Sequence, residues 1–188
     1  MSNEKFNNAV NIAKYICENT LKLGDTAVDC TLGKGNDSIL LAHLVGNMGK
    51  VFSFDIQKEA INKTKEKLKE FSFENIIFIN DGHENLDKYV EEKVKLFIFN
   101  LGYLPGKDHN ITTKAETTLR ALKKALNLLD DNGIVLLVIY HGHKNGKEEK
   151  VVLDEFTSKL DQKVYNVMKS SFINQANNPP LLICIEKR

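Results

Sequence analysis

The sequence has few cysteines, few prolines and no large surplus of charge. Its 188 residues contain 3 cysteines, an odd number without Cys-x-x-Cys spacing, which predicts neither a disulfide framework nor a zinc site. The 3 prolines and 11 glycines leave no room for a long flexible linker. The 26 basic and 25 acidic residues give a formal charge of +1. This balance excludes a histone-like or tail-driven nucleic-acid binder, although not a local basic patch.

The sequence also lacks a long apolar segment and a secretion signal. Its longest apolar run, residues 134–140, is far too short to cross a bilayer. The N-terminus has neither the apolar stretch nor the cleavage site of a signal peptide, so we expect a cytoplasmic protein with no membrane partner. With 42% hydrophobic and 27% charged residues, residues 1–188 are expected to form one globular domain.

What the sequence does contain is a regular alternation of short apolar runs and longer amphipathic stretches. An N-terminal helix is expected over residues 6–21, so that residues 1–22 pack on the rest of the fold. The runs expected as strands are residues 26–30, 50–55, 75–80, 94–100, 133–140, 163–169 and 181–186. The stretches expected as helices are residues 37–45, 57–71, 84–91, 112–129 and 147–160.

This alternation predicts an α/β fold of the Rossmann type. Strands joined by helical crossovers form a mostly parallel sheet, here of seven strands, with helices on both faces. Residues 170–180 form only a loop between the last two runs, so these two strands are expected to pair antiparallel.

A glycine-containing loop follows the first predicted strand. Gly33 and Gly35 allow a tight turn and the close approach of a ligand to backbone N–H groups at the next helix. Ligands bind open parallel sheets outside the carboxyl ends of the strands, which favours ligand binding over a simple capped turn. Asp29 and Asp37 flank the loop and disfavour a dinucleotide, because carboxylates attract a cationic ligand and repel a pyrophosphate.

The next two predicted strands also end in polar residues at this edge. Asp55 follows the second strand, where it can accept hydrogen bonds from ribose hydroxyls or cap the next helix. Asp81 or His83 follows the third strand and would lie near an adenine, although Asp81 and Gly82 could also form only a turn.

The fourth and fifth strands lead into loops with candidate catalytic residues. The side-chain carbonyl of Asn100 can orient an incoming amine, and Tyr103 can form an aromatic wall over a base or a cation. His109, His141 and His143 lie in loops expected at one rim, where a histidine can take a proton near neutral pH. No His-x-x-x-His helix or cysteine partner supports a metal site, so none is expected.

Several motifs together resemble a known family. The acidic-x-Thr-x-Gly-x-Gly loop at residues 29–35 is similar to that of class I S-adenosylmethionine-dependent methyltransferases, although Thr31 stands where many members have glycine. Residues 100–105 resemble the (Asp/Asn)-Pro-Pro-aromatic signature of methyltransferases that act on amino groups, with residues 101–102 replacing the first proline. With the segments YHGHKNG and NNPPLLICIEK, the chain resembles the small family of putative rRNA methylases of Gram-positive bacteria over nearly its whole length.

The resemblance implies S-adenosylmethionine as the cofactor and the 5-aminomethyl group of a tRNA wobble uridine as the substrate. N-methylation there gives 5-methylaminomethyl(-2-thio)uridine, and an alkylammonium must lose a proton before it can attack. The candidate orienting groups and bases are Asn100, Tyr103, Asp108, His109, His141 and His143. The residues expected to hold the cofactor are Asp29, Thr31, Gly33, Gly35, Asn36, Asp37, Asp55, Gln57, Asp81, Gly82, His83, Asn100 and Leu101.

The expected partner is the anticodon stem-loop of the tRNA. The candidate phosphate contacts are Lys107, Lys144, Lys147 and Lys150. Glu148 and Glu149 interrupt this patch and weaken it, so a homodimer that shares the RNA surface is compatible with the sequence.

Three alternatives stay open at this stage. The chain could methylate ribosomal RNA or a small amine, reduce or oxidise a substrate with a nicotinamide cofactor, or sense a ligand without catalysis. Tyr140 and Lys144 match the Tyr-x-x-x-Lys dyad of short-chain dehydrogenases. That dyad needs one helical face, and Gly142 and the strand end argue against a helix there.

Overall fold

The computed structural model describes residues 6–69, 73–102 and 112–188. The helices are α1 (Ala9–Thr20), α2 (Asn36–Val45), α3 (Lys58–Leu68), α4 (Ala115–Leu128), α5 (Lys144–Thr157) and the 3₁₀ helix η1 (His83–Lys88). The strands are β1 (Thr26–Asp29), β2 (Lys50–Phe54), β3 (Ile76–Ile79), β4 (Val94–Leu101), β5 (Leu129–Ile139), β6 (Tyr165–Ser170) and β7 (Leu181–Lys187).

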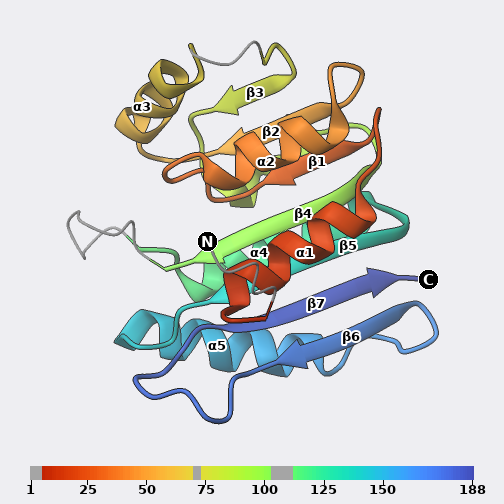
Figure 1. Cartoon of the computed structure of the whole chain (residues 1–188). Coiled ribbons are helices and arrows are strands. Elements are labelled where there is room, and N and C mark those ends of the chain that lie inside the picture. Colours follow the sequence, from red (N-terminus) through yellow and green to blue (C-terminus); the bar gives the residue numbers. More distant parts are fainter. Residues whose placement is uncertain (1–5, 70–72, 103–111) are drawn as a thin grey trace.

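Within the described residues, the seven strands form one sheet in the order β3-β2-β1-β4-β5-β7-β6 (Figure 1). The neighbours from β3 to β5 pair in parallel, and β7 runs antiparallel to both β5 and β6. The predicted α/β class, the mostly parallel sheet and the antiparallel pairing of the last two strands are confirmed. The carboxyl ends of β1 to β5 therefore meet at one edge of the sheet, together with the start of β7.

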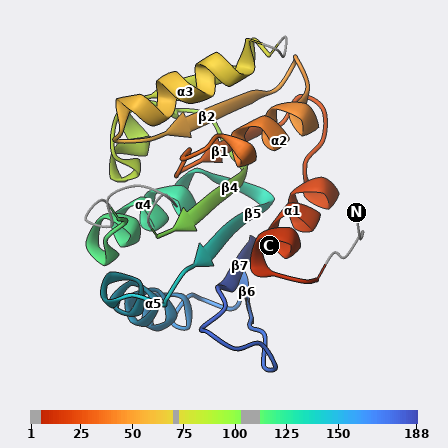
Figure 2. The ribbon, with the colours of Figure 1, turned by 60° about the vertical axis from the view of Figure 1, so that its left-hand side comes forward.

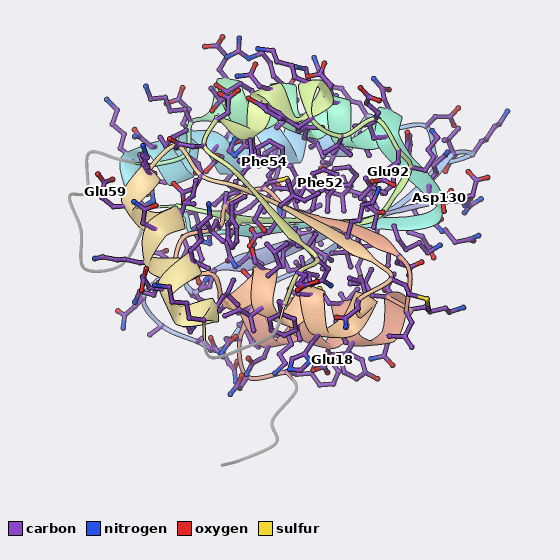
Figure 3. The ribbon with its side chains drawn as sticks, turned by 90° about the horizontal axis from the view of Figure 1, so that it is seen from above. Glu18, Phe52, Phe54, Glu59, Glu92 and Asp130 are labelled. Carbon is purple, nitrogen blue, oxygen red and sulfur yellow. The ribbon has the colours of Figure 1, made fainter. Side chains whose placement is uncertain are left out.

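Two helical layers cover the two faces of the sheet (Figure 2). On one face α1 and α2 bury Ala13 and Leu41 against Val138 and other strand residues. On the other face α4 and η1 pack on residues such as Phe54. Seen from above, Phe52 and Phe54 lie between the sheet and this second layer, whereas Glu18 and Glu59 lie on the outside (Figure 3). Burial of apolar surface on both faces explains why the central strands are almost uniformly hydrophobic.

Several expected elements differ from the structure, and α1 and α4 each begin three residues later than expected. The helix expected over residues 84–91 is wrong: η1 is a short 3₁₀ helix, whose position Lys124 of α4 fixes through hydrogen bonds to the Glu84 carbonyl and to Asp87. β5 begins at Leu129, earlier than expected, because this buried residue pairs with Val94 before the register shifts. α5 begins three residues earlier than expected, at Lys144 instead of residue 147.

None of the helices in the described part of the chain combines the length and the hydropathy that a bilayer-spanning segment needs.

Candidate functional site

The loop between β1 and α2 is fixed to both strands that flank β1. The backbone N–H of Leu32 donates to the carbonyl of Phe54 at the end of β2, over 2.9 Å. On the other side, the hydroxyl of Thr31 accepts a 2.7 Å hydrogen bond from the backbone N–H of Asn100 in β4. The loop therefore lies in the crevice between the carboxyl ends of β2 and β4, where an open α/β sheet binds its ligand.

Two glycines allow this close approach. Gly33 and Gly35 have φ angles of +51° and +75°, in the left-handed region that residues with a side chain rarely adopt. A β-carbon on Gly35 would lie 2.4 Å from the γ-methyl of Thr64 in α3, so the loop also needs glycine there for lack of space.

Two carboxylates and one carbonyl already occupy three of the loop's backbone N–H donors. Thr31 donates to Oδ1 of Asp29 and Gly33 donates to Oδ2 of Asp55, both over 3.0 Å. Gly35 donates to the carbonyl of Leu32 over 2.7 Å. A pyrophosphate would have to displace these acceptors and approach two carboxylates, so the geometry favours a cationic ligand.

Asp29 lies beneath the loop in a fully buried network. Its Oδ2 accepts a 2.6 Å hydrogen bond from Ser38, and the hydroxyls of Ser38 and Ser53 are 2.8 Å apart. Burial, followed by the nearby charge of Asp37, raises the pKa of Asp29 to about 7. Its contact with a ligand stays a prediction. In this structure the carboxylate positions the loop and adds negative charge below it.

Asp37 and Asn100 join α2 to the end of β4. The amide nitrogen of Asn100 donates to Oδ2 of Asp37 over 2.6 Å. Burial raises the pKa of Asp37, and the hydrogen bond from Asn100 partly opposes this shift. Within the described part of the chain, the buried Oδ1 of Asn100 has no hydrogen-bond partner. Contact of this acceptor with an amine stays a prediction.

Tyr140 is a candidate site residue that the sequence reasoning did not include. It directly follows β5, its backbone N–H donates to the carbonyl of Leu101, and it is 40% exposed. Its β-carbon would be 3.3 Å from a β-carbon on Gly102. Burial and the charge of Asp37 raise the pKa of its hydroxyl. Its position at the carboxyl end of a central strand could have indicated a site residue. In the sequence analysis, Tyr140 is considered only as part of a dehydrogenase dyad and is dismissed.

Asp55 fixes the second side of the crevice. Its Oδ1 accepts the backbone N–H of Gln57 over 2.8 Å, so this carboxylate shapes the start of α3 as well as the glycine loop. A carboxylate has further lone pairs with which to accept ribose hydroxyls. Ile56, which follows it, is 63% exposed and offers an apolar surface to a base. The sequence reasoning did not include Ile56, because exposure cannot be read from a single isoleucine.

Other expected cofactor residues are held by structural contacts. Asp81 accepts hydrogen bonds from Asn85, Gly82 and Tyr89, which outweigh burial and lower its pKa. His83 is 8% exposed, its Nδ1 lies 3.0 Å from the carbonyl of Cys30, and burial lowers its pKa. The side chain of Leu101 is fully buried in the core.

Asn36, another expected cofactor residue, is exposed, and its Oδ1 accepts a 2.9 Å hydrogen bond from Lys67. Ligand contacts of Asn36, Asp81, His83 and Leu101 stay predictions.

The candidate bases have different surroundings. His143 was expected in a loop, but it is the N-cap of α5 and its Nδ1 accepts the backbone N–H of Gly146 over 3.1 Å. His141 is half-buried and lines a hollow at the same edge of the sheet. The expected site residues Tyr103, Asp108 and His109, and the expected phosphate contact Lys107, lie outside the described residues.

Two further expectations concern the basic surface patch and a metal site. Glu149 was expected to weaken a basic surface patch, but it is fully buried and accepts hydrogen bonds from Thr113 and Thr118. Its carboxylate therefore ties α5 to α4 and leaves the surface more basic than the sequence suggested. In residues 6–69, 73–102 and 112–188, no group of three potential metal ligands lies together.

Comparison with known proteins agrees with the fold, which is that of a class I methyltransferase. Residues 51–186 match the family described as "Putative rRNA methylase", and the chain belongs to this family. It is 34% identical over 190 residues to the chloroplastic tRNA (mnm(5)s(2)U34)-methyltransferase of Arabidopsis thaliana, covering 95% of this chain and 69% of the relative.

Two solved structures resemble the whole chain. The crystal structure of a putative rRNA-methylase from Clostridium thermocellum has 47% identity and a TM-score of 0.96, covering 98% of this chain and all of that one (100%). A methyltransferase from Streptococcus mutans in complex with SAH has 38% identity and a TM-score of 0.89, covering 97% and 99%. The predicted family and methyltransferase fold are confirmed.

We expect Gly35→Ala to weaken the loop. The left-handed φ and the contact with Thr64 should lower the free energy of unfolding by about 1 kcal/mol or more. Urea unfolding followed by circular dichroism measures the change. Gly142→Ala is the matched control, because a β-carbon there meets nothing within 4 Å. Equal stability of the two variants would contradict a requirement for glycine at position 35.

The raised pKa of Asp29 predicts a pH dependence of stability. The folded chain holds this proton up to about pH 7, whereas the unfolded chain loses it near the ordinary aspartate pKa of 3.8. The contribution of Asp29 to stability is therefore present below pH 4 and is lost as the pH rises to 7. Unfolding of the wild type and Asp29→Asn at several pH values should show a steeper decline for the wild type. Parallel curves would refute a raised pKa at Asp29.

Proposed function

We propose that this protein is an S-adenosylmethionine-dependent RNA methyltransferase that N-methylates the 5-aminomethyl group of the wobble uridine in tRNA. The product would be 5-methylaminomethyl(-2-thio)uridine. The observation that carries this specific reaction is the match of 95% of the chain to the tRNA (mnm(5)s(2)U34)-methyltransferase of Arabidopsis thaliana. The Streptococcus mutans relative in complex with SAH supports the cofactor.

The residues of the crevice fit this cofactor. When bound, S-adenosylmethionine supplies a methyl group on a positively charged sulfur, beside a positively charged ammonium. Once ionised, the carboxylates of Asp29 and Asp37 suit these cations, because opposite charges attract. Asp55 can accept the ribose hydroxyls, and Ile56 can contact the adenine.

The end of β4 suits the amine substrate. The unpartnered, buried Oδ1 of Asn100 can accept an N–H of the amine and aim its lone pair, which is mainly a contribution of positioning. Tyr140 lies against Gly102, two residues after Asn100. The amine must reach the site neutral or lose its proton there. Of the proposed bases, His141 keeps an open position, whereas His143 uses its Nδ1 to cap α5.

We also propose a single-domain cytoplasmic enzyme whose partner is the anticodon stem-loop, with a homodimer as a compatible assembly. Methylation of ribosomal RNA or of a small amine is the alternative that the following experiment separates.

We expect the purified protein, given S-adenosylmethionine and tRNA from a strain that lacks the gene, to convert 5-aminomethyl to 5-methylaminomethyl nucleosides. Nucleoside mass spectrometry measures the conversion. Because the Asn100 carbonyl orients the amine, Asn100→Ala should lower kcat by about a hundredfold.

Asn166→Ala is the control for this substitution, since Asn166 is exposed on β6 and bonds to Glu186 and Arg188. Unchanged wobble nucleosides, with a methyl group found on ribosomal RNA instead, would refute the tRNA assignment.

A further inference from the structure

A second hollow lies beside the crevice, at the carboxyl edge of the sheet. It has a volume of about 420 Å³, and its walls come from His141 after β5, Lys150 in α5, Lys169 in β6 and the segment 171–180 that leads to β7. Leu181 pairs with Ile139, so this segment starts β7 at the edge where β5 ends (Figure 1). His141 directly follows Tyr140 in the chain. The hollow therefore begins next to the proposed methyl-transfer site.

The hollow has a surplus of positive charge. The ammonium groups of Lys150 and Lys169 lie 2.9 and 2.7 Å from the same carboxylate oxygen, Oδ2 of Asp154. These lysine side chains are 32% and 44% exposed. Two cations share one anion, and Asp154 holds them close together although they come from different elements. The surplus is local, in a chain whose formal charge is only +1.

Amide side chains form the opposite wall. Asn177 and Asn178, with φ angles of +63° and +50°, make a left-handed turn before Pro179, and both line the hollow. Asparagine tolerates this conformation better than other residues with a side chain. Amides donate to phosphate oxygens and both donate to and accept from ribose hydroxyls, the group that distinguishes RNA from DNA.

We infer that this hollow binds the phosphodiester backbone of the substrate RNA next to the nucleotide that is methylated. The inference rests on the proposed function, since it assumes an RNA substrate. Lysine ammonium groups neutralise phosphates, and the amides contact the sugar or the flanking base. A nucleotide that reacts at Asn100 and Tyr140 must have its neighbouring phosphates held in place. The hollow offers a basic surface next to that point.

The test measures binding directly, by fluorescence anisotropy of a labelled anticodon stem-loop with the full-length protein. The double substitution Lys150→Ala/Lys169→Ala should weaken RNA binding by about tenfold or more, and lower the slope of log affinity against log salt by about 1 to 2. Affinity for S-adenosylmethionine should stay unchanged. In the methylation assay KM for tRNA should rise, and kcat should stay within about threefold.

Two further variants separate binding from folding. Asp154→Asn removes the anion and frees both lysines, so it should tighten RNA binding and steepen the salt dependence. If the three residues only stabilised the fold, both sets of substitutions would weaken binding. Lys159→Ala is the matched control, because Lys159 is 70% exposed, pairs with Glu155 and lies outside the hollow.

The outcomes distinguish this inference from the proposed function. If the double variant binds RNA with the affinity and salt slope of the wild type, the hollow does not bind the RNA backbone, even if the protein methylates tRNA. If RNA binding depends on the two lysines but tRNA is not methylated, the result would support RNA binding at the hollow and refute the proposed reaction. A wild-type protein that binds no RNA would overturn both.

Discussion

The crowding of carboxylates at one edge of the sheet is the constraint on which the site depends. Asp29 is completely buried, the charge of Asp37 acts on it, and Asp55 accepts a hydrogen bond from the same glycine loop. Repulsion and burial make this arrangement costly without a cation, as the raised pKa values of Asp29 and Asp37 indicate. A bound cationic cofactor would relieve that cost, and a diphosphate would increase it.

The surrounding structure holds these charges in place through short hydrogen bonds. Thr31 ties the loop to β4, Leu32 ties it to β2, and Ser38 of α2 fixes the buried carboxylate. The left-handed glycine at position 35 lets α3 pack directly on the loop. The parallel order of β1, β2 and β4 brings all these groups together, although they are far apart in the sequence.

Much of the fold was predictable from the sequence, since buried parallel strands such as residues 94–100 are continuous apolar runs. The acidic residues after the strands were predictable as a group, because parallel strands end at a common edge. What failed depended on tertiary contacts. Nothing in the sequence near Glu149 shows that two threonine hydroxyls from other segments bury it. Likewise, the contact of Tyr140 with the end of β4 arises from the register of two strands that are separate in sequence.

The central claim is that the crevice accepts a cation, and titration calorimetry tests it most directly. S-adenosylmethionine and NADH would each be titrated into the protein at pH 7, in two buffers of different ionisation enthalpy. The account predicts that S-adenosylmethionine binds and releases protons, because a cation lowers the pKa of the Asp29–Asp37 pair, and that NADH does not bind. Binding of NADH without binding of S-adenosylmethionine, or proton uptake with the latter, would contradict the account.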